Sequence, residues 1–90
     1  MVTAAIIVKI MPDSPETNLE AIKNSARSLL EAEGAKNISF EERPIAFGLK
    51  AVMLKMAWPE EKNTSIIEDG LAKIEHVSSA SIEDYRRAFG

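Results

Sequence analysis

Few residues in this chain have side chains that could support catalysis. The 90 residues include one histidine, His76, and no cysteine, which excludes thiol catalysis, disulfides and thiolate metal sites. Two of the pairs of adjacent acids are Glu41 with Glu42 and Glu60 with Glu61. Neighbouring residues of a strand point to opposite faces, so neither pair is suited to act as a carboxylate dyad. His76 has the position of a solvated residue at a helix end. We therefore predict no catalytic centre, no metal site and no bound cofactor.

Two short stretches have the composition of contact surfaces instead. The first, RPIAFGLK at residues 43–50, places apolar side chains between a proline and a glycine in a predicted strand connection. Apolar loop residues often mark contacts, but a loop that packs on itself would look the same. The second is the C-terminal YRRAFG at residues 85–90, which is also typical of a frayed basic tail. The candidate contact residues are Pro44, Ile45, Ala46, Phe47, Gly48, Lys50, Arg86 and Arg87.

The secondary-structure elements that position these stretches are predicted from hydrophobic periodicity and from the proline and glycine residues that end each element. Strands are predicted over 3–11, 36–43, 49–58 and 77–87, and helices over 18–33 and 65–75. A capping box of Thr17 and Glu20 is expected to begin the first helix, and Gly34 to end it. Asn63 or Thr64 is expected to cap the second helix. Gly70 is expected to weaken that helix by roughly 1 kcal/mol relative to alanine.

The order of these elements is β-α-β-β-α-β, which is typical of the ferredoxin-like α+β fold. Right-handed crossovers would put both helices on one face of a four-stranded antiparallel sheet, and residues 1–90 would form a single domain. We further expect the 43–50 loop and the end of the last strand to lie at the same end of the sheet. Phe47 and Arg87 would then belong to one surface.

Several function classes are disfavoured by the same residues. The first loop, PDSPETN, lacks both the Cys-x-x-Cys of a metal carrier and the arginine-bearing, glycine-rich cradle of a phosphate hydrolase. A net charge of −3 weighs against nucleic-acid binding, and so does the lack of aromatic residues before Trp58 on the first and third strands. The N-terminal apolar run is too short to span a bilayer, which takes about 20 residues. We therefore expect a soluble, cytoplasmic protein that does not contact membranes.

Five segments of the sequence, taken together, resemble one known family. They are KIMPDSPETNLE, GAKN, PIAFGLKAV, SIIEDGLAKIEHV and SIEDYRRAFG, and they span essentially the whole chain in order. PIAFGLKA is the most specific of them. The chain resembles the archaeal elongation factor 1-beta family, the counterpart of the C-terminal exchange domain of eukaryotic elongation factor 1B.

The resemblance implies a guanine-nucleotide exchange factor rather than an enzyme. Its partner would be elongation factor 1-alpha, the GTPase that delivers aminoacyl-tRNA. Separately from the resemblance, we expect a monomer that does not contact nucleic acid directly. By resemblance, Phe47 is the apolar anchor, with Pro44 and Gly48 shaping its loop. The family also uses a basic residue near the end of the last strand, a lysine in eukaryotic members. Arg87 falls at that position, beside Arg86, and the resemblance leaves open which arginine takes the role.

Two other kinds of function remain as alternatives. One is a regulatory module of the same fold that senses a small molecule or assembles into oligomers through its sheet edges. The chain has no glycine-rich ligand loop that would support this reading. The other is a nucleic-acid-binding protein, which the acidic balance disfavours.

Overall fold

The computed structural model describes residues 3–88, and the side chains of residues 3–86. Its elements are β1 (Thr3–Pro12), α1 (Leu19–Ala32), β2 (Lys36–Pro44), β3 (Lys50–Pro59), α2 (Ser65–Ala72) and β4 (Val77–Ala88). The predicted order of strands and helices is confirmed. In the described part of the chain, no helix is long and apolar enough to cross a membrane.

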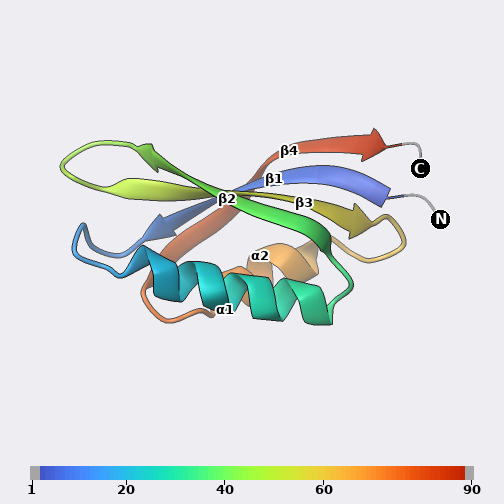
Figure 1. Ribbon diagram of the computed structural model, residues 1–90, viewed down its shortest axis with the longest axis horizontal. Helices are drawn as coiled ribbons and strands as arrows, with labels where there is room; N and C mark the ends of the chain where they lie inside the picture. Colours follow the sequence, from blue (N-terminus) through green and yellow to red (C-terminus); the bar gives the residue numbers. More distant parts are fainter. Residues whose placement is uncertain (1–2, 89–90) are drawn as a thin grey trace.

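The four strands form one antiparallel sheet in the order β2-β3-β1-β4. Both helices cover the same face of this sheet, so the molecule has two layers and the predicted ferredoxin-like α+β fold (Figure 1). The most apolar strand, β1, lies in the interior of the sheet, as its composition predicts. The opposite face of the sheet carries no helix, and we call it the open face.

The core lies between the sheet and the helices, and among the described residues every buried side chain is apolar. Alternate residues of β1 point into it, because successive side chains of a strand point to opposite faces. The buried positions of α1 recur every four residues and form one stripe along the helix. The core residues contributed by these two elements are Ala4, Ile6, Val8, Ile10, Ile22, Ala26 and Leu30.

Helix α1 begins one residue later than its sequence suggests. Asn18 is the N-cap, and its side-chain oxygen accepts a hydrogen bond from the backbone N–H of Glu20 at 3.0 Å. The predicted capping box is therefore wrong, because the Thr17 hydroxyl donates instead to Asp13 at 2.8 Å. The predicted C-terminus is correct. Gly34 has a φ of 98°, and its backbone N–H and that of the next residue bond back to the last turn as in a Schellman motif.

Helix α2 is shorter than predicted and ends at Ala72, because the following residues turn more tightly than an α-helix. Thr64 occupies the cap position, whereas the side chain of Asn63 accepts the bond from the backbone N–H of Ser65. Gly70 faces α1, and a Cβ placed there would lie 3.0 Å from a methyl carbon of Leu29. The glycine thus lets the two helices approach closely, which the sequence did not indicate.

The strand directions overturn one expectation about the contact residues. Both β3 and β4 pair antiparallel to β1, so they run in the same direction as each other. At one end of β1, Thr3 pairs with Ala88 and also with Pro59, which end β4 and β3. The loop that carries Phe47 precedes β3 and therefore lies at the opposite end (Figure 1). The expectation that Phe47 and Arg87 share one surface is wrong.

Candidate partner-contact site

The loop between β2 and β3 is a tight hairpin turn built around Phe47. The backbone N–H of Leu49 donates to the carbonyl of Ala46, and that of Ile45 to the carbonyl of Leu49, both at 2.9 Å. Phe47 and Gly48 have positive φ angles of 54° and 80°. Two successive positive φ angles are the pattern of a type I′ turn, whose twist matches that of the flanking strands. Gly48 adopts this conformation freely.

The backbone of Phe47 has a conformation that is unusual for a bulky residue, and its side chain makes almost no contact with the rest of the protein. A bulky residue with positive φ is a genuine outlier, because its Cβ crowds the backbone, and such strain costs of order 1–3 kcal/mol. The side chain is nevertheless 97% exposed, so no packing within the chain compensates for the strain. Ile45 beside it is 43% exposed. The turn therefore presents an aromatic ring to the solvent at a cost in stability.

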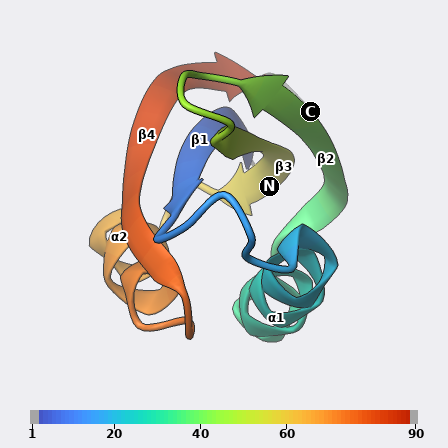
Figure 2. The ribbon, with the colours of Figure 1, turned by 90° about the vertical axis from the view of Figure 1, so that its left-hand side faces the viewer.

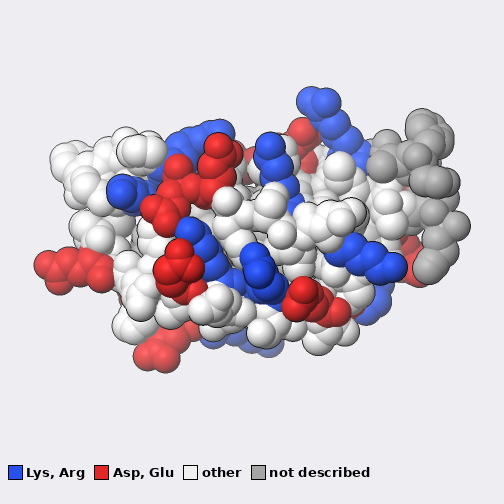
Figure 3. Space-filling model, in the orientation of Figure 1, with Lys and Arg blue, Asp and Glu red and all other residues white. Residues whose placement is uncertain are grey.

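The turn is supported from below by the loop between β1 and α1. A Cβ placed on Gly48 would lie 3.6 Å from the Cβ of Pro15, which is ordinary van der Waals contact. Figure 2 looks onto this end of the molecule and shows the β2–β3 turn next to the β1–α1 loop. In Figure 3 the turn forms a largely uncharged end of the molecule. An apolar tip on a braced hairpin is suited to enter a pocket of another protein.

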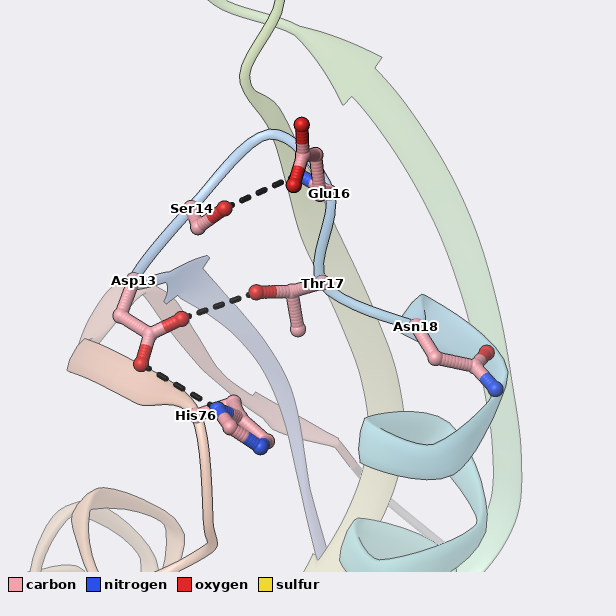
Figure 4. Close-up of a pocket in the computed structure, with 6 residues that line it drawn as sticks. All are labelled: Asp13, Ser14, Glu16, Thr17, Asn18 and His76. Carbon is pink, nitrogen blue, oxygen red and sulfur yellow. Dashed lines mark hydrogen bonds and ion pairs between the residues drawn. The ribbon is translucent and has the colours of Figure 1, made fainter.

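The β1–α1 loop is itself fixed by the carboxylate of Asp13 (Figure 4). One carboxylate oxygen accepts the bond from Thr17, and the other lies 3.4 Å from Nδ1 of His76. The backbone N–H of Asp13 also donates to the carbonyl of His76 at 2.9 Å. These residues line a surface hollow together with Ser14, Glu16 and Asn18. Sequence reasoning missed this brace, since no pattern links residues so far apart in the chain.

Two carboxyl groups near this end of the molecule have lowered pKa values. The Thr17 hydroxyl and, to a smaller extent, the His76 ring hold the pKa of Asp13 below its ordinary 3.8. The Lys23 ammonium lies 2.8 Å from Glu42 on β2 and lowers the pKa of that carboxyl from 4.5. The same contact raises the pKa of Lys23. Both interactions tie the end of the sheet that carries Phe47 to neighbouring elements.

The predicted basic residues lie at the other end of the sheet. Arg86 pairs with Ala5 in the β1–β4 ladder, is 80% exposed at its side chain, and has Nε 3.0 Å from Asp84. Arg87 pairs with Ala4 through its backbone, and its side chain lies outside the described residues. The longest dimension of the molecule is 41 Å. The eight candidate residues therefore form two separate groups, with residues 44–50 at one end and the arginines at the other.

Comparison with known proteins identifies the family of this chain. Residues 5–88 match the EF-1 guanine nucleotide exchange domain. The chain belongs to that family. Proteins named Elongation factor 1-beta are similar over nearly the full length. The one from Methanosphaera stadtmanae is 36% identical across 97% of this chain and 98% of its own. The one from Methanobrevibacter smithii is 42% identical, across 89% and 90% respectively. The one from Metallosphaera sedula is 38% identical, across 91% of each.

Membership of the EF-1 exchange-domain family confirms the resemblance seen in the sequence. The match includes both groups of candidate residues, because it extends from residue 5 to residue 88. A guanine nucleotide exchange domain implies a GTPase as the general kind of partner. The geometry indicates where contacts with such a partner can be made.

Proposed function

We propose that this protein is a guanine-nucleotide exchange factor for elongation factor 1-alpha, which promotes release of GDP and reloading with GTP during polypeptide elongation. The observation that carries the proposal is the strained and 97% exposed Phe47 at the hairpin turn, in a chain of the EF-1 exchange-domain family. It acts without a catalytic residue or a cofactor, as a cytoplasmic monomer that does not bind nucleic acid directly.

The physical requirement for exchange is differential affinity. A GTPase holds GDP through phosphate contacts and a bound Mg²⁺, so a partner that binds the nucleotide-free form more tightly shifts the equilibrium toward release. Binding energy from a buried aromatic anchor can supply that preference. Because Phe47 needs no rearrangement to become accessible, the anchor is already in place before the partner arrives.

The second contact in this proposal is made by the arginines of β4. A cation that enters the Mg²⁺ region of the GTPase would disfavour the metal by charge repulsion. Arg86 and Arg87 lie near the end of the sheet opposite Phe47. The two contacts must therefore reach two separate regions of the GTPase, and neither can compensate for loss of the other.

The proposal is tested with elongation factor 1-alpha loaded with fluorescent GDP, in the presence of Mg²⁺ and excess GTP. Catalytic amounts of the wild-type protein should accelerate GDP release, and Phe47→Ala should lower that acceleration at least about tenfold, equivalent to 1.4 kcal/mol. Glu16→Ala, an exposed change on the neighbouring loop, is the matched control and should behave as wild type. No acceleration by the wild-type protein would refute the proposed function, and full activity of Phe47→Ala would refute the anchor.

Charge reversal distinguishes the two arginines. Arg86→Glu and Arg87→Glu are compared over a range of Mg²⁺ concentrations, because a residue that competes with the metal changes the Mg²⁺ dependence of release. The variant that abolishes this dependence identifies the cation. If both variants keep the wild-type Mg²⁺ dependence, neither arginine acts at the metal.

A further inference from the structure

The open face of the sheet has a charge opposite to that of the molecule as a whole. Cross-strand pairing places five basic side chains on it: Lys9, Lys36, Arg43, Lys55 and Arg86. Three acidic residues share this face. They are Glu41, Asp84 and Glu83, which lies in the β4 bulge and accepts a hydrogen bond from Ser81. The face thus has a formal surplus of two positive charges, although the chain has a net charge of −3. The rest of the chain consequently has a formal charge of −5.

The centre of the open face presents lysines that are not neutralised by the protein itself. Lys9 lies on β1 opposite Met53, and Lys55 lies on β3 opposite Ile7. Among the ion pairs of the described side chains, none includes either lysine, and on this face only Arg86 has a carboxylate partner. A hollow on this face is lined by Lys55, Asp84 and Arg86, together with Ala5 and Ile7. In Figure 3 basic side chains project from the sheet side of the molecule, with some acidic side chains among them.

The open face also connects the two contacts of the proposed function. The Phe47 turn extends from β2 and β3 at one end, and Arg86 lies on the open face at the other. A partner that reaches both ends must run along a long side of this molecule. The two helices and the loops that flank them have more acidic than basic residues, whereas the open face has more basic than acidic residues. No helix covers the open face (Figure 1). Small side chains such as Ala5 and Ala57 on this face leave room for close approach.

We propose that the GTPase lies along the open face and that this face receives an acidic region of its surface. The inference rests on the proposed function, because it takes the GTPase as the partner. Complementary charge steers association and fixes orientation more than it adds affinity. The open face therefore orients the exchange factor before Phe47 enters its pocket. It also favours Arg86 over Arg87 as part of the docked surface, since Arg86 is known to lie on this face.

The test compares two lysines that differ in location. Lys55→Gln and Lys73→Gln each change the net charge from −3 to −4, and both residues are exposed. Lys73 lies at the end of α2, on the helix side. Association with the GTPase is followed by stopped-flow fluorescence at low salt and at about 1 M salt, where the screening length is about 3 Å.

We expect Lys55→Gln to slow association at low salt by roughly threefold and Lys9→Gln/Lys55→Gln by about tenfold, within the range known for electrostatic steering. Lys73→Gln should have a smaller effect than Lys55→Gln, and the difference should vanish at about 1 M salt. Circular dichroism confirms that all variants are folded.

Three outcomes would overturn the inference. Equal effects of Lys55→Gln and Lys73→Gln, with exchange by the wild-type protein intact, would show that overall charge matters rather than the open face. Faster association of Lys55→Gln would show that the facing surface is basic. Binding of transfer RNA that Lys55→Gln abolishes, with GTPase association unchanged, would assign the face to nucleic acid. Lack of any exchange by the wild-type protein would instead refute the proposed function, and this inference with it.

Discussion

Phe47 and Trp58 stand near the two ends of the same strand, β3, and their environments are opposite. Trp58 is fully buried, and its indole N–H donates to the carbonyl of Lys62 at 3.2 Å. Phe47 is 97% exposed and strained. Burial of a large aromatic side chain stabilises the fold, whereas exposure of one leaves its apolar surface available for a partner. If Phe47 is the proposed anchor, substitutions of Trp58 should affect stability and substitutions of Phe47 should affect exchange.

The largest effect should follow the loss of Trp58. Trp58→Ala removes a fully buried ring and leaves a cavity, so we expect the free energy of unfolding to fall by about 3–5 kcal/mol. Urea denaturation followed by far-ultraviolet circular dichroism measures it. Trp58→Phe keeps most of the ring and loses the bond to Lys62, so its cost should be clearly smaller. If Trp58→Ala cost under about 1 kcal/mol, the proposed division between the two ends of β3 would fail.

Phe47→Asn sharpens the comparison, because it removes the ring and relieves the backbone. Asparagine tolerates positive φ far better than phenylalanine does, so stability should stay level or rise by up to about 1 kcal/mol. GDP release should fall as much as in Phe47→Ala. Thermal denaturation and the exchange assay are run on the same preparation. A variant that lost both stability and exchange would mean that Phe47 supports the fold.

Low pH should weaken the interactions that the Asp13 and Glu42 carboxylates make near the Phe47 turn. The pKa values of Asp13 and Glu42 are lowered in the folded protein, so their contribution to stability is complete above the ordinary values of 3.8 and 4.5. It disappears as the pH falls through the lowered values. We expect the melting temperature to drop below about pH 4, and the drop to be smaller in Asp13→Asn. An identical pH profile for Asp13→Asn would show that the Asp13 carboxylate does not stabilise the β1–α1 loop.

The smallest effect is expected between the helices. Gly70→Ala gains up to about 1 kcal/mol of helix propensity, but its methyl group would lie 3.0 Å from the flexible end of Leu29. These two effects oppose each other, so the change in the free energy of unfolding should be within about 1 kcal/mol of zero. Denaturant titration measures it. A gain of a full 1 kcal/mol would show that Leu29 moves aside without cost.

Much of the fold follows from local patterns. The alternating apolar residues of β1 and the four-residue spacing in α1 each mark the buried face of the element. These two periods distinguish a strand from a helix, so the type and order of the elements can be predicted from the sequence. The exact caps were harder, because Thr17 and Asn18 are adjacent polar residues with similar reach. The structure decides between them, since Asp13 already bonds the Thr17 hydroxyl.

The candidate site was only partly predictable. RPIAFGLK indicated an apolar turn, but it did not indicate the positive φ of Phe47. A tight turn could be attributed to Gly48 alone, because glycine adopts positive φ freely. The relative placement of Phe47 and Arg87 was wrong, because it depends on strand direction rather than on composition. The charge of the open face depends on cross-strand register, so the net charge of the chain concealed it.

The interior position of β1 has a consequence for folding during synthesis on the ribosome. β1 is synthesised first, yet both strands that pair with it come from the second half of the chain, and β4 is the last element. The β2–β3 hairpin can form locally before β4 is synthesised. Until then β1 has unpaired backbone groups and exposed apolar side chains, and such a state is prone to aggregation. A chain shortened before β4 should therefore be less soluble, and it would also lack Arg86 and Arg87, the residues of the proposed second contact.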